Sequence, residues 1–192
     1  MNYKKAGEDM QKNIKPMKEN ALIGILSELL AIECGYSPKE ARQIRIAAVL
    51  HDVGKKFIPE HIKNKPDKLN AAEYEIMKTH TKLGAEMLSS LCGDLGEMAR
   101  TIAMYHHEVW QDGGGYWGVP SYTLPHYVGI VSICDVFVAL ISTERLYKEP
   151  WSKEDAIKFI KSQAGTKFCP ILADIFVSMI RSNGNMPANI FC

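Results

Sequence analysis

Apolar residues recur at helical spacing along most of the chain. Between Pro16 and Glu33 they fall three or four positions apart, which predicts a helix with one buried face. Similar patterns predict helices over residues 38–50 and 71–87, one ending near 107, one over about 125–142, one beginning at 152 and one over 170–182. Alternation of apolar and polar residues is nowhere long enough to predict a strand. We therefore expect an all-α fold.

Short polar motifs predict where several helices begin. The segment Ser37-Pro38-Lys39-Glu40 has the spacing of a capping box, with proline at the first helical position. The same spacing recurs in Asn70-Ala71-Ala72-Glu73, and Ser152 stands three residues before Asp155. Because such side chains bind the exposed N–H groups of a first helical turn, we expect three helix starts here.

The segments between the predicted helices differ in composition. Residues 54–69 contain two prolines and five lysines, which predicts a structured loop. Gly93 and Gly96 interrupt a helical pattern and predict a turn. Residues 108–125 hold four glycines, two prolines, two tryptophans and two tyrosines. Long loops inside compact domains are usually functional, so this aromatic loop is a candidate part of a site.

Length and composition indicate one globular domain. The 192 residues contain 46% hydrophobic and 23% charged residues, both ordinary values. We expect a lead-in over residues 1–15, a domain over 16–182 and a tail over 183–192. The net charge of +1 gives no electrostatic case for duplex nucleic acid or a membrane surface. The longest apolar stretch, Ile130 to Ile141, is too short to span a bilayer, which needs about 20 residues.

Cysteine usage points to a reducing compartment. The five cysteines are odd in number, scattered and without a C-x-x-C pair. No apolar signal region follows Met1. We therefore expect a cytoplasmic protein with reduced thiols.

Histidine and aspartate residues suited to metal binding are spread over four predicted helices: His51, Asp52, His80, His106, His107 and Asp135. Adjacent residues on a helix point about 100° apart, so neither doublet should hold one ion as an i,i+4 pair would. Each doublet can instead reach two neighbouring ions, which predicts a binuclear centre. A single histidine is more often an ordinary core or surface residue, and we read His61 and His126 in that way.

Asp135 gives a separate argument. It lies in the apolar segment 130–141, where an unpaired buried carboxylate would cost several kcal/mol. A metal ion would satisfy it. The alternatives are that Asp135 caps a helix or pairs with Arg100.

The surrounding motifs extend this pattern over about residues 16–180. They are His51-Asp52-Val53-Gly54-Lys55, Ile58-Pro59, Lys65-Pro66 with Lys68-Leu69, Glu75 to His80, His106-His107-Glu108 with Trp110, Asp112-Gly113, Asp135-Val136-Phe137 with Ala139-Leu140, Arg145, Tyr147, and Gly165-Thr166 with Phe168. In order and approximate spacing, the chain resembles the HD superfamily of phosphohydrolases, and specifically the HD-GYP branch known for cyclic di-GMP phosphodiesterases.

The resemblance implies an HD-type bundle of about seven to eight helices around a metal site. Carried over by position, the ligands would be Glu19, His51, Asp52, His80, His106, His107 and Asp135. Glu19 stands where the family has a histidine, and its alternative is a surface residue in a first helical turn. Lys15 stands where trinuclear members carry a glutamate, which argues against a third ion. We expect two divalent ions, iron or manganese, for these oxygen and imidazole ligands.

This chain departs from the family in the substrate region. The signature glycine-tyrosine-proline is Gly115-Tyr116-Trp117, and Gln111 resembles a one-residue insertion. Proline would stiffen the turn, so tryptophan should leave it freer. Val138 replaces a second aspartate, and an extra residue precedes Arg145.

The function implied is hydrolysis of a cyclic dinucleotide, cyclic di-GMP first, to pGpG or GMP by a metal-bridging hydroxide. Asp52 would bridge the metals and Lys55 would neutralise phosphate charge. Arg145 could grip a second phosphate, and Tyr116 or Trp117 could stack on a base or simply pack in the loop.

Two alternatives remain open. One is an HD phosphohydrolase of another nucleotide or phosphoester. The other is a catalytically weakened module that senses a nucleotide or a partner. A homodimer, or fusion to or association with signalling proteins, would also fit.

Overall fold

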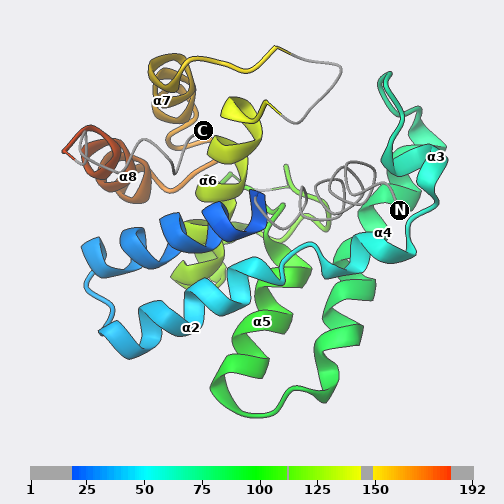
Figure 1. Cartoon of the computed structure of the whole chain (residues 1–192), viewed down its shortest axis with the longest axis horizontal. Coiled ribbons are helices and arrows are strands. Elements are labelled where there is room, and N and C mark those ends of the chain that lie inside the picture. Colours follow the sequence, from blue (N-terminus) through cyan, green and yellow to red (C-terminus); the bar gives the residue numbers. More distant parts are fainter. Residues whose placement is uncertain (1–18, 112, 144–148, 183–192) are drawn as a thin grey trace, which may run out of the picture.

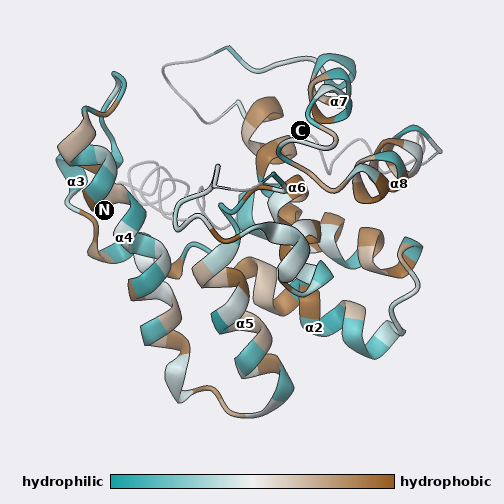
Figure 2. Ribbon diagram, turned by 180° about the vertical axis from the view of Figure 1, so that it is seen from behind, coloured by the Kyte–Doolittle hydropathy of each residue, from teal (hydrophilic) through white to brown (hydrophobic). Residues whose placement is uncertain are grey.

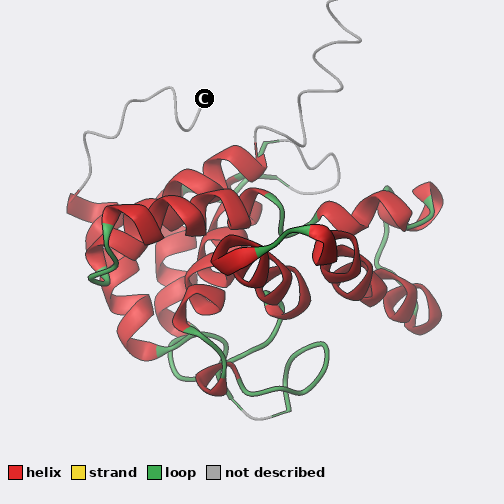
Figure 3. Ribbon diagram, turned by 90° about the horizontal axis from the view of Figure 1, so that it is seen from below, coloured by secondary structure: helices red, strands yellow, loops and turns green. Residues whose placement is uncertain are grey.

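The chain folds as a bundle of helices (Figure 3). The structure, a computed structural model, describes residues 19–111, 113–143 and 149–182. Over these residues it contains helices, turns and one isolated bridge between Ala164 and Phe168, but no strand. The predicted all-α class is confirmed. The predicted lead-in and tail, together with Lys15, Asp112, Arg145 and Tyr147, lie outside the described residues.

The longer helices follow the predicted order (Figure 1). After a first helix over residues 19–33 come α2 (Pro38–Val49), α4 (Ala71–Met87), α5 (Gly93–Tyr105), α6 (His126–Ile141), α7 (Lys153–Ser162) and α8 (Pro170–Ser182). Short elements lie between them: η1 (Val53–Phe57), α3 (Glu60–Lys63), η2 (Leu88–Ser90) and η3 (Ser121–Thr123). None of the described helices is long and apolar enough to cross a membrane.

The predicted helix starts are confirmed. The hydroxyl of Ser37 accepts a hydrogen bond from the backbone N–H of Glu40, whose carboxylate accepts one from the N–H of Ser37. Asn70 and Glu73 form the same reciprocal box at α4. At α7 the hydroxyl of Ser152 accepts from the N–H of the third helical residue. Side-chain chemistry within four residues therefore determines these boundaries.

Two predicted irregular segments turn out to be partly helical. Residues 54–69 include most of η1 and all of α3, because Ile58 and Ile62 are each only 3% exposed and anchor the segment to the interior. Gly96 lies inside α5 and does not break it. A Cβ at Gly96 would lie 2.1 Å from the carbonyl oxygen of Leu91, so this glycine permits the tight packing of the preceding turn against the helix.

Helices α4 and α5 lie side by side and run in opposite directions, with α2 packed against α5 (Figure 1). Helix α6 occupies the centre and contacts α5, α7 and α8. Its apolar residues face neighbours on several sides, as at Phe137, whose ring centroid lies 5.1 Å from that of Phe176 in α8. Brown apolar positions gather on the inward faces of the helices (Figure 2). One contiguous core therefore supports every element that carries a candidate ligand.

Candidate metal centre

The His51-Asp52 doublet follows the end of α2. That helix ends at Val49, and Asp52 immediately precedes η1, which packs against α4. Gly54 permits this packing, because a Cβ there would lie 1.9 Å from the backbone carbonyl oxygen of His80. The close approach of the two backbones brings Asp52 to the helix that carries His80.

The second doublet lies at the end of α5. The helix ends at Tyr105, His106 is its C-cap, and His107 follows in a turn. The ring centroids of the two histidines are 4.0 Å apart with planes tilted by 45°. The expectation that adjacent side chains diverge assumed a continuous helix and is wrong here, because α5 ends at Tyr105 and both histidines follow its last residue.

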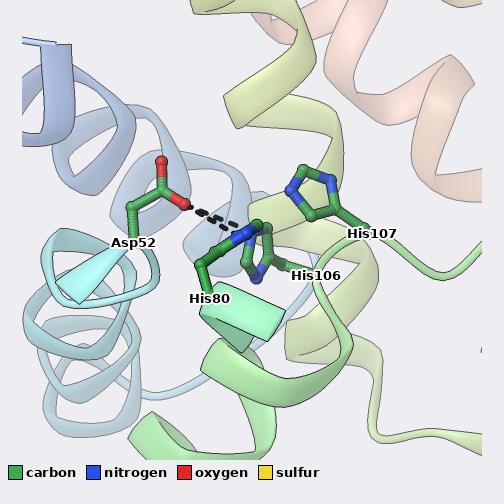
Figure 4. A group of neighbouring side chains, drawn as sticks. All are labelled: Asp52, His80, His106 and His107. Atoms are coloured by element: carbon green, nitrogen blue, oxygen red, sulfur yellow. Dashed lines mark ion pairs between the residues drawn. The ribbon is translucent and has the colours of Figure 1, made fainter. Parts of the chain in front are cut away.

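Asp52 faces His80 and His106, and His107 lies beyond them (Figure 4). Its Oδ1 lies 3.2 Å from Nε2 of His80 and 3.6 Å from Nε2 of His106. One ligand atom from each of Asp52, His80, His106 and His107 falls within 4.8 Å of the others. Three separate elements therefore converge on a volume of the size that one metal ion needs.

His51 and Asp135 extend the cluster on the other side of Asp52. Nε2 of His51 lies 3.2 Å from Asp52 Oδ2 and 3.7 Å from Asp135 Oδ1. The Asp135 side chain is 17% exposed and sits in the interior of α6, so it does not cap a helix. Arg100 donates to the carbonyl of Leu91 instead of pairing with Asp135. The two oxygens of Asp52 thus face two different sets of ligand atoms, as a shared ligand would.

Backbone carbonyls orient three of the histidine rings. Nδ1 of His51 lies 2.7 Å from the carbonyl oxygen of Ala48, and Nδ1 of His80 lies 2.6 Å from that of Met77. Nδ1 of His106 lies 3.0 Å from the oxygen of Ile102. A carbonyl oxygen can only accept, so each Nδ1 carries a proton. In a neutral ring this arrangement leaves the Nε2 lone pair for a metal ion.

The atoms that face the centre lack hydrogen-bond partners among the described residues. Nε2 of His51, His80 and His106, and Oδ1 of Asp52, are all buried in this way. The three histidine side chains are fully buried. Buried polar atoms are almost always satisfied in folded proteins, so four orphaned atoms pointing at one place require a ligand. Imidazole nitrogens and carboxylate oxygens suit iron, manganese or zinc, and the residues therefore fit a divalent metal.

Burial and charge set the protonation of the metal-free cluster. Burial disfavours the charged form of His51, but Asp52 and Asp135 outweigh it and raise the pKa of His51 to about 10. Burial lowers the pKa of His106 and lowers that of His107 to about 2. Burial opposes ionisation of Asp52 and Asp135, yet His51 holds the pKa of both well below the ordinary value. In the metal-free cluster, Asp52 and Asp135 therefore favour the charged form of His51 and His51 favours the charged form of both carboxylates.

The other predicted site residues include Lys55, Glu19 and Arg145, of which the structure describes the first two. Nζ of Lys55 lies 2.5 Å from Asp52 Oδ2, so this lysine stands at the edge of the cluster. The carboxylate of Glu19 accepts a hydrogen bond from the hydroxyl of Ser142, at the end of α6. Its role as a ligand stays a prediction. Arg145 lies outside the described residues.

The aromatic loop covers the cluster at Tyr116. Its ring centroid lies 4.4 Å from that of His107, with the planes tilted by 35°, and 6.1 Å from that of His80. The side chain of Trp117 contacts α4 at a different residue: its indole N–H donates to the hydroxyl of Thr81, 3.1 Å away. The indole therefore ties this turn to α4, and the expectation that replacing proline leaves the turn freer stays a prediction.

Glu108 belongs to the His106-His107-Glu108 motif, and the structure gives it a structural role in the site that the motif did not indicate. It is 2% exposed, and its two carboxylate oxygens accept hydrogen bonds of 2.8 Å from the backbone N–H groups of Trp117 and Val119. Gly115 packs directly on it, since a Cβ there would lie 2.4 Å from Glu108 Oε2.

An open cavity of about 280 Å³ lies beside the aromatic loop. It is lined by Val109, Gln111, Gly114, Gln163, Thr166 and Lys167. Backbone hydrogen bonds from Trp110 to Lys167 and from Gln111 to Thr166 hold its two walls together. Burial lowers the pKa of Lys167, against the opposing charge of Asp135. The loop between α7 and α8 therefore braces the aromatic loop from the side away from α4.

Comparison with known proteins agrees with this geometry. A family model described as HD domain matches residues 10–172. The cyclic di-GMP phosphodiesterase response regulator RpfG of Xanthomonas campestris is 40% identical over 147 residues, covering 76% of this chain and 38% of that protein. The 3'3'-cGAMP-specific phosphodiesterase 2 of Vibrio cholerae is 38% identical over 156 residues, covering 81% of this chain and 30% of that protein. The chain thus spans less than half the length of these relatives.

A solved structure shares the fold. Bd1817, described as an HDG"Y"P protein from Bdellovibrio bacteriovorus, superposes with a TM-score of 0.68 at 20% identity and covers 86% of this chain and 52% of that one. The resemblance inferred from the motifs is confirmed by the family match and by relatives named as cyclic dinucleotide phosphodiesterases. The chain belongs to the HD domain family.

Proposed function

We propose that this domain is a metal-dependent phosphodiesterase that hydrolyses a cyclic dinucleotide, with cyclic di-GMP as the first candidate. One observation carries the proposal: the orphaned Nε2 atoms of His51, His80 and His106 converge on Asp52. A cluster of this kind is costly unless it serves a ligand. The relatives named as cyclic di-GMP and 3'3'-cGAMP phosphodiesterases support the substrate class.

In this proposal the ligands form two overlapping sets. His80, His106, His107 and Oδ1 of Asp52 make one set, and His51, Asp135 and Oδ2 of Asp52 make the other. Two ions, iron or manganese, would then share Asp52. When bound, they would supply positive charge for the phosphate oxygens and would lower the pKa of a water molecule enough to provide hydroxide, the nucleophile, at neutral pH.

Three residues of the chain would bind and orient the substrate. Lys55 lies beside Asp52 and is 37% exposed on its side chain, so it can turn from the carboxylate to a phosphate that enters from solvent. Tyr116 forms a wall over His107 and limits the approach to one side. Arg145, which we expect to hold a second phosphate, follows α6 in the chain.

A second candidate substrate is 3'3'-cGAMP or another phosphoester. The relative at 38% identity is named for 3'3'-cGAMP, and this chain carries Trp117 where the family has proline. A third candidate function is a module with the same fold that binds a nucleotide but does not hydrolyse it. The expected cytoplasmic location, and the expected homodimer or signalling partner, also stay predictions.

The test is metal analysis followed by a substrate panel. The chain is loaded with Mn²⁺ or, without oxygen, with Fe²⁺, and incubated with cyclic di-GMP, 3'3'-cGAMP and a generic phosphodiester, following pGpG and GMP by chromatography. Turnover of cyclic di-GMP with stoichiometric metal is the expected result. Metal binding with turnover of another substrate alone would move the assignment to the second candidate, and failure to bind metal would overturn both enzyme readings.

A further inference from the structure

Trp117 contacts α4 through its side chain. Its indole N–H donates to the hydroxyl of Thr81, which is fully buried. The ammonium group of Lys82 lies 3.6 Å from the centre of an indole ring, and that of Lys78 lies 5.1 Å away. A lysine over an aromatic face is attracted by the ring quadrupole. The indole therefore has both a polar and a cationic partner on one helix.

The backbone of Trp117 is held separately. Its N–H donates to Oε1 of Glu108, and the N–H of Val119 donates to Oε2 of the same carboxylate. Glu108 directly follows His107, and Thr81 directly follows His80. One residue of the aromatic loop is thus bonded to the neighbours of two candidate metal ligands on different elements.

Tyr116 lies between these attachments and the cluster. Its ring faces His107 at 4.4 Å and also contacts Tyr74 of α4, 5.7 Å between centroids. Glycine-rich loops lose much conformational freedom when they are ordered, and a wall already fixed before substrate arrives avoids that loss during binding. The bonds of Trp117 supply such fixation where proline would otherwise restrict the turn.

We propose that Trp117 is a positioning residue, which fastens the aromatic loop to α4 through Thr81 and Lys82 and thereby holds Tyr116 as a fixed wall over His107. In this proposal Trp117 contacts only other residues of the protein, and Tyr116 is the residue that stacks on a nucleobase of the substrate. This role rests on the proposed metal centre, because Trp117 and Tyr116 would determine how substrate reaches that centre.

The experiment is a double-mutant cycle between Trp117→Phe and Thr81→Val in the full chain. The first removes the N–H and keeps an aromatic ring, and the second removes the acceptor at nearly constant volume. The matched control is Trp110→Phe, in the same loop, where the ring packs on Tyr122 at 5.7 Å. A cycle isolates the shared bond because losing either partner should cost the same interaction.

Three readouts are measured. Hydrogen exchange at the amides of Trp117 and Val119 is followed in the metal-free protein, and the rate at which excess EDTA removes bound Mn²⁺ is followed in the loaded protein. KM and kcat for cyclic di-GMP are measured last. We expect each single variant to exchange and to lose Mn²⁺ about two- to tenfold faster, the scale of one hydrogen bond. Because Thr81→Val also removes the bond from its hydroxyl to the carbonyl of Lys78, and Trp117→Phe alters the contact with Lys82, the effect of the double variant should be smaller than the sum of the two single effects. KM should rise more than kcat falls.

The outcomes separate this inference from the proposed function. Unchanged exchange and Mn²⁺ release in Trp117→Phe, or effects that simply add in the double variant, would overturn the positioning role. Changes equal to those of Trp110→Phe would do the same, because they would reflect general loop packing. If the variants behave as expected while the unmodified chain hydrolyses none of the tested substrates, the positioning role stands and the proposed phosphodiesterase activity falls.

Discussion

Oδ1 of Asp52 lies 3.2 Å from Nε2 of His80, yet neither atom makes a hydrogen bond within the described part of the chain. The two residues come from different elements that meet at Gly54, where backbone lies directly on backbone. Such an approach positions two unsatisfied ligand atoms at the separation that a metal ion between them would require. The pair therefore supplies the most direct test of the centre.

Replacing Asp52 with alanine should abolish metal binding and activity together. Among the residues that the structure describes, this carboxylate alone faces both ligand sets, so metal affinity should fall more than about 100-fold, beyond the loss typical of a supporting residue. Metal content after dialysis, measured by plasma mass spectrometry, and phosphodiesterase turnover are the readouts. Asp67→Asn, at an exposed position, is the control. Full metal content in Asp52→Ala would refute the assignment.

Metal affinity should rise with pH. The pKa of His51 is raised to about 10 in the metal-free cluster, so below that pH the ring is protonated and an ion must displace the proton. Raising the pH lowers this cost, and affinity should increase about tenfold per pH unit for each proton released. Mn²⁺ titrations between about pH 6 and about pH 8, in weakly coordinating buffers, measure the slope. An affinity independent of pH would show that His51 gives up no proton.

Gly54→Ala should destabilise the fold and weaken metal binding. The added Cβ would meet the carbonyl oxygen of His80 at 1.9 Å, and backbone cannot move aside as a flexible side chain can. We expect a loss of about 3 kcal/mol in the free energy of unfolding, the upper range for overpacking. Urea denaturation measures it. Gly129→Ala is the control, since its Cβ would meet only the side-chain tip of Leu172 at 3.0 Å.

Glu108→Gln should loosen the aromatic loop. A carboxylate accepts from two backbone N–H groups, whereas an amide offers one oxygen and one NH2 donor, so one partly buried N–H loses its partner. The expected cost is about 1–3 kcal/mol in the free energy of unfolding. Denaturation of the metal-free protein measures the effect without reference to catalysis, and the exposed Glu86→Gln is the control. Equal stability of both variants would contradict the role given to Glu108.

Lys55→Met should lower turnover while metal stays bound. Lys55 is proposed to meet phosphate charge that develops during hydrolysis, and loss of one such group typically costs about 10²–10³ in kcat. Steady-state kinetics and metal content are measured side by side, with the exposed Lys68→Met as control. A variant that loses metal and activity in equal measure would indicate that Lys55 instead supports Asp52, to which it is paired at 2.5 Å.

Local sequence determined the helices and their starts. The capping residues Ser37, Asn70 and Ser152 act within their own first turn, so their effect is readable without knowing the fold. The candidate metal ligands were also readable, because histidine and aspartate doublets on apolar helices are costly without a ligand. The HD motifs then indicated the family.

Tertiary structure alone decided how those residues meet. Gly54 on His80 and the end of α5 at Tyr105, just before His106 and His107, determine the geometry, and both depend on packing between segments far apart in the chain. The same holds for the bond from Trp117 to Thr81, which joins the aromatic loop to α4 and which no spacing in the sequence indicated. Sequence spacing reports neighbours along one element. Contacts between elements depend on where each backbone ends and how closely it can approach the next.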